Sequence, residues 1–83
     1  MKLAKYVKFR EEKFGGVLFE TRSEKVYTLN PTATAVVREI QGGAGEHDIP
    51  VRLKERFRDE DGAIEREAVT FIAELRQKGL VED

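Results

Sequence analysis

The pair Asn30-Pro31 divides the chain into two parts with different hydrophobic patterns. Before the pair, apolar residues alternate with charged ones, as in strands, and after it they recur at helical spacing. Asparagine caps free backbone N–H groups at a helix start, and proline suits the first helical turn, where its missing donor costs nothing. The pair therefore predicts that a strand at residues 25–29 turns directly into a helix.

The part before Asn30 predicts a three-stranded antiparallel meander. In KYVKFR, Val7 and Phe9 alternate with lysine and arginine, and GVLFE follows a Gly15-Gly16 turn signal. The segment TRSE separates GVLFE from the third strand, KVYTL. Because these connections are short, the strands are expected to pair in sequence order, which makes the third strand an edge.

Three helices are expected after the strands. The glycines of QGGAG end the first helix, Asp48 caps the second, and the third begins after Gly62 and ends at Gly79. The apolar stripes of these helices are Ala33, Val36, Val37 and Ile40 in the first, Ile49, Leu53 and Phe57 in the second, and Ile64, Ala68, Phe71, Ile72 and Leu75 in the third.

Strands followed by helices, with no internal repeat, predict an α+β fold. We expect a winged-helix-like domain in which the three-stranded meander precedes three α-helices that cover one of its faces. A chain of 83 residues buries only about 60% of its unfolded surface, so residues 1–83 are expected to form a single domain. The predicted core comprises Phe9, Leu29, Val36, Leu53, Phe57, Ala68 and Leu75.

The residue types present offer little for catalysis. The chain has no cysteine, which excludes disulfides, thiolate metal sites and cysteine nucleophiles. Its single histidine, His47, falls in a glycine-rich connection and is interpreted as a solvated loop residue. The run Asp59, Glu60 and Asp61 resembles the start of a calcium loop but lacks the later ligands, so it is interpreted as a helix-capping turn. We expect no enzyme, no metal and no cofactor.

Charge and hydropathy limit the partners. A formal net charge of −1 gives no overall field that would attract nucleic acid. No apolar stretch follows the basic N-terminal segment, so neither a signal peptide nor a membrane span is expected, and the protein is predicted to be cytoplasmic with no membrane partner. The alternative function is a winged-helix DNA-binding protein, because the second helix carries Arg52, Lys54, Arg56 and Arg58, although the charges of the third helix sum to zero.

The segments VYTLNPTATAVVREIQGG, LKERF and FIAELRQKGLV together resemble the PqqD-like family, the leader-peptide recognition elements of ribosomally synthesised, post-translationally modified peptides. The resemblance covers nearly the whole chain. Its most specific parts are Leu29-Asn30 followed by a small-residue helix start, and the closing GLV at residues 79–81. The chain departs from the family at Ala68 and Arg76, where larger apolar residues are common.

The resemblance implies a non-catalytic adaptor. Family members bind the leader of a precursor peptide as an added strand beside the third strand, and the third helix forms the other wall of a cleft. The adaptor presents the peptide to a separate maturation enzyme, often a radical S-adenosylmethionine enzyme or alternatively a leader peptidase. An edge strand fits this role, because its unpaired N–H and C=O groups can bond a peptide main chain. Such an edge also allows a homodimer through strand exchange or pairing.

The predicted peptide-binding residues lie on two elements. They are Lys25, Val26, Tyr27 and Thr28 on the strand, and Glu65, Val69, Ile72 and Arg76 on the third helix. The helical set shares one flank of the apolar stripe at about 100° per residue. Val69 and Ile72 would receive apolar leader side chains, and Arg76 would pair with an acidic one. Strand alternation places Tyr27 and Leu29 on the core side.

Overall fold

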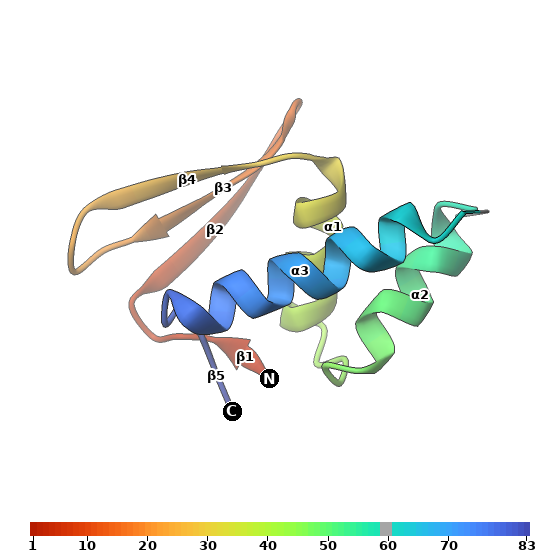
Figure 1. Cartoon of the computed structure of the whole chain (residues 1–83). Coiled ribbons are helices and arrows are strands. Elements are labelled where there is room, and N and C mark those ends of the chain that lie inside the picture. The colour runs from red at the N-terminus through yellow and green to blue at the C-terminus, as the bar shows by residue number, and fades with distance from the viewer. Residues whose placement is uncertain (59–60) are drawn as a thin grey trace.

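The computed structural model describes residues 1–58 and 61–83 of the chain. Its elements are β1 (Lys2–Leu3), β2 (Val7–Glu12), β3 (Gly15–Glu20), β4 (Lys25–Leu29), α1 (Pro31–Gln41), α2 (Asp48–Arg56), α3 (Ala63–Gln77) and β5 (Val81–Glu82). The strands β2, β3 and β4 form one sheet, and the helices follow it in sequence, with α1 and α2 at one end of the sheet and α3 running alongside it (Figure 1). The predicted α+β order, a three-stranded antiparallel sheet and then three helices, is confirmed.

The first hairpin of the sheet turns at Lys13 and Phe14, between the paired ends of β2 and β3. The sequence prediction placed this turn at Gly15-Gly16, which instead begins β3. The glycines serve close packing, since a Cβ on Gly15 would lie 2.2 Å from the carbonyl oxygen of Leu29. Side chains do not fit at that distance, so the absence of a Cβ lets the end of β4 pair closely with β3.

The predicted N-cap residue is correct for α1 and is displaced by one position for α2. The side chain of Asn30 caps α1, because its oxygen accepts a hydrogen bond from the Ala33 N–H at 2.8 Å, and Pro31 is the first helical residue. In α2 the predicted cap, Asp48, is already helical, and the cap position belongs to His47, whose side chain makes no capping bond. Asp48 instead places a negative charge in the first turn, where the helix dipole favours it.

Glycines in the left-handed region bound α3 at both ends. Gly62 stands at its N-cap with φ +78°, and Gly79 follows its last turn with φ +71°. The first backbone N–H of α3 donates to Asp61 Oδ1 at 3.0 Å, which is the capping role predicted for this acidic run. The other two members of the run, Asp59 and Glu60, lie outside the described residues.

A second sheet, which no pattern in the sequence predicts, joins β1 and β5 near the two ends of the chain. Strand β1 pairs antiparallel with β5, and the Ala4 N–H donates to the Leu80 carbonyl oxygen at 2.9 Å. The Tyr6 hydroxyl also donates to the Gly79 carbonyl oxygen at 2.8 Å. Strands of two residues are too short to show alternation in a sequence. Their pairing holds the C-terminal end of α3 close to the start of β2.

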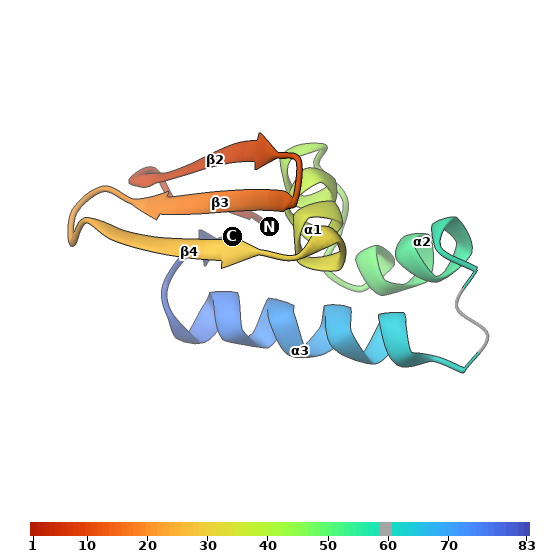
Figure 2. The same cartoon turned by 90° about the horizontal axis from the view of Figure 1, so that it is seen from above.

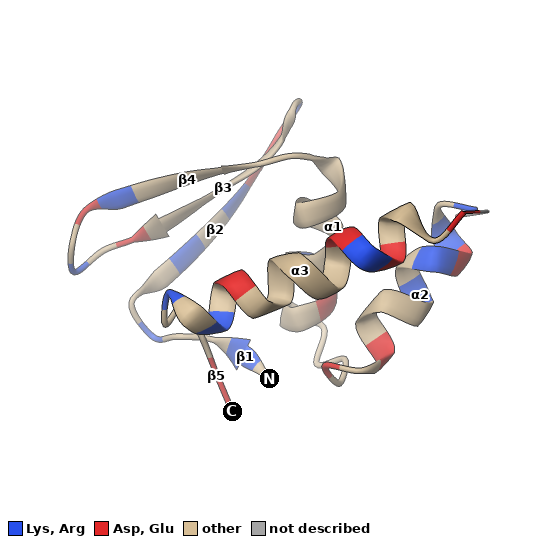
Figure 3. Cartoon of the chain, viewed as in Figure 1, with Lys and Arg blue, Asp and Glu red and all other residues tan. Residues whose placement is uncertain are grey.

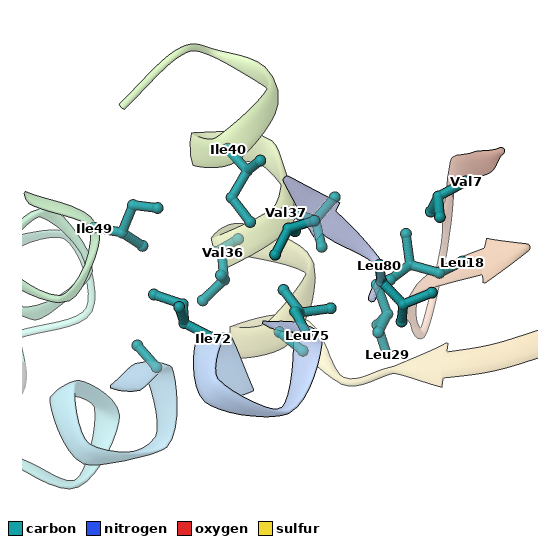
Figure 4. Packing of buried hydrophobic residues seen from close by; sticks show 14 of the residues in the cluster. Val7, Leu18, Leu29, Val36, Val37, Ile40, Ile49, Ile72, Leu75 and Leu80 are labelled. Carbon is teal, nitrogen blue, oxygen red and sulfur yellow. The ribbon is translucent and has the colours of Figure 1, made fainter. Parts of the chain in front are cut away.

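The core lies where α1 meets α3 and the inner face of the sheet (Figure 4). Of the predicted core residues, Leu29, Val36, Leu53, Ala68 and Leu75 are buried, and Phe9 is half-buried against them. The prediction is wrong for Phe57, which is 39% exposed. Helix α2 ends at Arg56, and the chain then turns through Arg58 with φ +52°, so Phe57 leaves the apolar stripe.

The described helices are too short or too polar to span a bilayer.

The prediction that the three helices cover one face of the sheet as a layer is not met in this arrangement. Helix α1 continues directly from β4 and makes the main packing against the sheet, while α2 lies beyond α1 (Figure 2). Helix α3 packs on α1 and α2 and runs alongside β4 in the opposite direction (Figures 1 and 2). The edge of β4 and one flank of α3 therefore face each other.

Candidate functional site

The outer edge of β4 has no partner strand among the described residues, because β4 ends the order β2-β3-β4. Which of its backbone groups face outward follows from one hydrogen bond. The Thr21 N–H donates to the Tyr6 carbonyl oxygen at 2.8 Å, so these two residues form a hydrogen-bonded pair just beyond the paired Val7 and Glu20. Pairs alternate along an antiparallel ladder, so the backbone groups of Glu20 must point away from β2 and toward β4.

The same alternation can be carried across to β4. Its register pairs Glu20 with Lys25 and Leu18 with Tyr27, and these become hydrogen-bonded pairs. The backbone N–H and C=O groups of the intervening residues, Val26 and Thr28, then point away from β3. Within the described residues, Val26 and Thr28 thus each present an N–H donor and a C=O acceptor that no strand pairs with, on the side that faces α3.

The side chains of β4 alternate as predicted. Leu29 is buried in the core, and Tyr27 is half-buried against it. Val26 and Thr28 are exposed, with 58% of the Val26 surface accessible. A strand added to this edge would therefore continue a sheet whose inner face is already fixed by Tyr27 and Leu29.

A hollow of about 350 Å³ lies between α3 and the start of α1, which follows β4 directly. Its lining consists of Asn30, Ala33, Arg66, Glu67, Thr70, Phe71 and Glu74. We call this hollow, together with the open edge of β4, the β4–α3 cleft. The Asn30 amide Nδ2 lies 3.4 Å from Glu67 Oε2, so the two sides of the cleft meet at its α1 end. Phe71 is half-buried against the core and supplies the apolar floor.

The α3 residues predicted for this cleft lie on the other flank of the helix. Glu65, Val69 and Ile72 line a second hollow of about 290 Å³, which Glu46, His47, Pro50 and Val51 complete from the α2 side. Ile72 is 4% exposed and belongs to the core, whereas Val69 is 54% exposed toward α2. The predicted helical wall must therefore be corrected to the flank that carries Glu67, Thr70, Phe71 and Glu74.

Arg76, predicted to meet an acidic peptide residue, is engaged within the chain. Its guanidinium Nε donates to Glu46 at 2.9 Å, and Nη2 lies 3.0 Å from Asp83 Oδ1. The hydrogen bond from Arg76 is the main cause that lowers the pKa of the Glu46 carboxyl below its usual range, and the same is true of the pKa of Asp83. Glu46 lies in the loop before α2, and Asp83 follows β5. Arg76 therefore links α3 to that loop and to the last residue of the chain.

The described residues show no arrangement typical of a catalytic or metal site. No group of three or more His, Cys, Asp or Glu within residues 1–58 and 61–83 could hold a metal ion. His47 is exposed at the start of α2. The one buried carboxylate of that part of the chain, Glu39, lies 2.6 Å from Arg52 Nε in an ion pair and accepts a hydrogen bond from Arg56 Nη2 at 3.1 Å. These contacts join α1 to α2 and have a structural role. The surface feature best suited to binding is the open edge of β4 with the hollow of about 350 Å³ beside it.

Solved structures with the same fold were found by comparison. The structure described as "TbiB1 in Complex with the TbiA(beta) Leader Peptide" matches with a TM-score of 0.83 and 18% identity, covering 99% of this chain and 95% of that one. The structure described as "Lasso peptide synthetase B1 complexed with the leader peptide" matches with a TM-score of 0.80 and 23% identity, over 99% and 96% of the two chains. At these identities the likeness establishes the fold.

Comparison by sequence gives the family. No curated protein sequence matches the chain significantly. The family model of "Coenzyme PQQ synthesis protein D (PqqD)" matches residues 15–81, which include β3, β4 and all three described helices. This match spans well over half of the chain and agrees with the resemblance seen in its motifs, so the chain belongs to the PqqD family.

Proposed function

We propose that residues 1–83 form a single peptide-recognition domain, a non-catalytic cytoplasmic adaptor for a ribosomally made precursor peptide. The leader of the precursor adds to β4 as a further strand, with its main chain on the outward N–H and C=O groups of Val26 and Thr28. Alternate leader side chains enter the hollow beside Phe71. The observation that carries this proposal is the open edge of β4 next to a hollow formed by α3.

Family membership and the two similar structures support the proposal. Both of those proteins were solved with a leader peptide bound, and each shares the fold of this chain over nearly its whole length. The adaptor would hold the leader so that the remainder of the precursor reaches a separate maturation enzyme. A radical S-adenosylmethionine enzyme or a leader peptidase would fill that role, and the chemistry would take place on that partner.

DNA binding, the alternative function, is less well supported. Of the basic residues on α2 that favoured it, Arg52 and Arg56 are paired with Glu39, and Lys54 Nζ lies 3.7 Å from Glu65 Oε2. Figure 3 shows acidic and basic residues mixed along α3. A helix that reads a DNA groove needs cations that are available for phosphate contacts, and these three on α2 are already in ion pairs within the protein.

Binding measurements would separate the two functions. The synthetic leader of a precursor peptide encoded beside this chain is expected to bind with a Kd on the order of 1 µM, or about −8 kcal/mol, in isothermal titration. A duplex DNA of about 20 base pairs should give no measurable heat at physiological salt. Tight DNA binding that weakens steeply with salt, together with no response to the leader, would show that the protein is a DNA reader instead.

A further inference from the structure

The two ends of the β4–α3 cleft carry opposite charge. Glu67 lines the hollow at the α1 end, beside Asn30, and Glu74 lines it about two turns further along the same flank of α3. Within residues 1–58 and 61–83 neither carboxylate forms an ion pair, and Glu67 Oε2 accepts a long hydrogen bond from the Asn30 amide, at 3.4 Å. Arg66 also lines the hollow, but its Nη1 is turned toward the helix start, where it donates to the Asp61 carbonyl oxygen at 3.2 Å.

The other end of the cleft is basic. Lys25 begins β4 and Lys78 follows the last residue of α3, and both are exposed. No ion pair to either lysine occurs in the described part of the chain. Because α3 runs alongside β4 in the opposite direction, the start of β4 and the end of α3 lie at the same end of the cleft (Figures 2 and 3). An extended peptide in the cleft would pass from two unpaired carboxylates to two unpaired ammonium groups.

The direction of that peptide follows from the sheet. Both existing strand pairs are antiparallel, and an antiparallel addition is the slightly more stable way to extend the ladder. The N-terminal half of an antiparallel peptide would lie beside Leu29 and Asn30, and its C-terminal half beside Lys25. Glu67 and Lys78 are eleven residues apart, about 16 Å along the helix, which about five residues of an extended strand span.

We propose, on the basis of the peptide-binding function above, that this cleft selects its peptide by charge order. It takes an extended segment with a lysine or arginine in its N-terminal half, an apolar residue over Phe71, and an aspartate or glutamate about five positions after the basic residue. Opposite charges across the cleft attract, and the reversed order would set like charges against each other at both ends. Glu67 and Lys78 are the residues that set the order.

The test is a selection from displayed random ten-residue peptides against the whole chain. Peptides enriched on the natural protein should carry a basic residue before an acidic one. Glu67→Lys should remove the preference for the basic residue and weaken a selected peptide about three- to fivefold, the size of an exposed ion pair. Glu55→Lys is the matched control, since Glu55 is an exposed helical residue on α2, and it should leave affinity and preference unchanged.

A second variant separates this inference from the proposed function. Val26→Pro removes an outward N–H of β4, so peptides that add to the edge should lose binding to it. Enriched peptides that depend on Val26 but show no charge order, or the reverse order, would overturn the inference and leave the edge-binding function standing. If no enriched peptide depends on Val26, both are wrong.

Discussion

Proline at two neighbouring positions of β4 is expected to give opposite results. Tyr27→Pro should destabilise the fold by roughly 3 kcal/mol, because it removes an N–H that faces β3 and bonds within the ladder. It also removes a ring that packs half-buried against the core. Val26→Pro removes an N–H that points away from β3, at a residue that is 58% exposed, so the melting temperature should fall much less.

The binding results should show the reverse pattern. Val26→Pro is expected to lower leader affinity by about tenfold or more, since a main-chain hydrogen bond is lost and the ring obstructs the added strand. Thermal melts and fluorescence anisotropy with a labelled leader would measure both effects on the two variants. If Val26→Pro unfolds the protein and Tyr27→Pro does not, the hydrogen-bond alternation assigned to β4 is wrong.

Gly15→Ala should be among the most damaging single substitutions outside the core. Its Cβ would stand 2.2 Å from the Leu29 carbonyl oxygen and 3.0 Å from the Asn30 carbonyl carbon, and the glycine has φ +148°. The atoms in the way are backbone, so β4 must shift away from β3 at the point where it enters α1. Backbone strain and overpacking each cost about 1–3 kcal/mol, so a loss of about 3 kcal/mol or more is expected in urea denaturation.

Gly43→Ala provides the matched control for this collision. Gly43 also has a positive φ, +87°, but a Cβ there would meet no heavy atom within 4 Å. It should therefore cost only the backbone strain, about 1–2 kcal/mol. Equal losses for the two variants would mean that the close approach of Leu29 to Gly15 does not matter for stability.

The parts of the fold that could be predicted are those that a local signal specifies. Asn30-Pro31 marks the strand-to-helix junction, since a capping side chain and a proline at the first helical position act within a few residues. The alternation in KVYTL likewise gave the faces of Tyr27 and Leu29. The turn at Lys13 and Phe14 could not be predicted in this way, because Gly15 and Gly16 look like a turn signal in the sequence. The structural reason for Gly15 is its close approach to Leu29 on β4, which a local pattern does not show.

The wall of the cleft was predicted on the wrong flank of α3 for a geometric reason. A helical stripe centred on Ala68 and Leu75 has two flanks, one with Glu65 and Val69 and one with Glu67 and Glu74. Spacing alone treats them as equivalent. Which flank faces β4 depends on how α2 and α3 pack around α1, and no local pattern in the sequence records it. Tertiary packing had to be known before the cleft could be assigned.

The most direct test of the account is amide hydrogen exchange along β4, measured by NMR with and without a bound leader. In the free protein the N–H groups of Val26 and Thr28 face away from β3 and should exchange quickly, while that of Tyr27 is protected by the ladder. A bound leader should slow exchange at Val26 and Thr28 by at least tenfold, because each gains a main-chain partner. If the leader binds and these two amides still exchange at their free rates, the peptide does not add to β4 and the adaptor mechanism is contradicted.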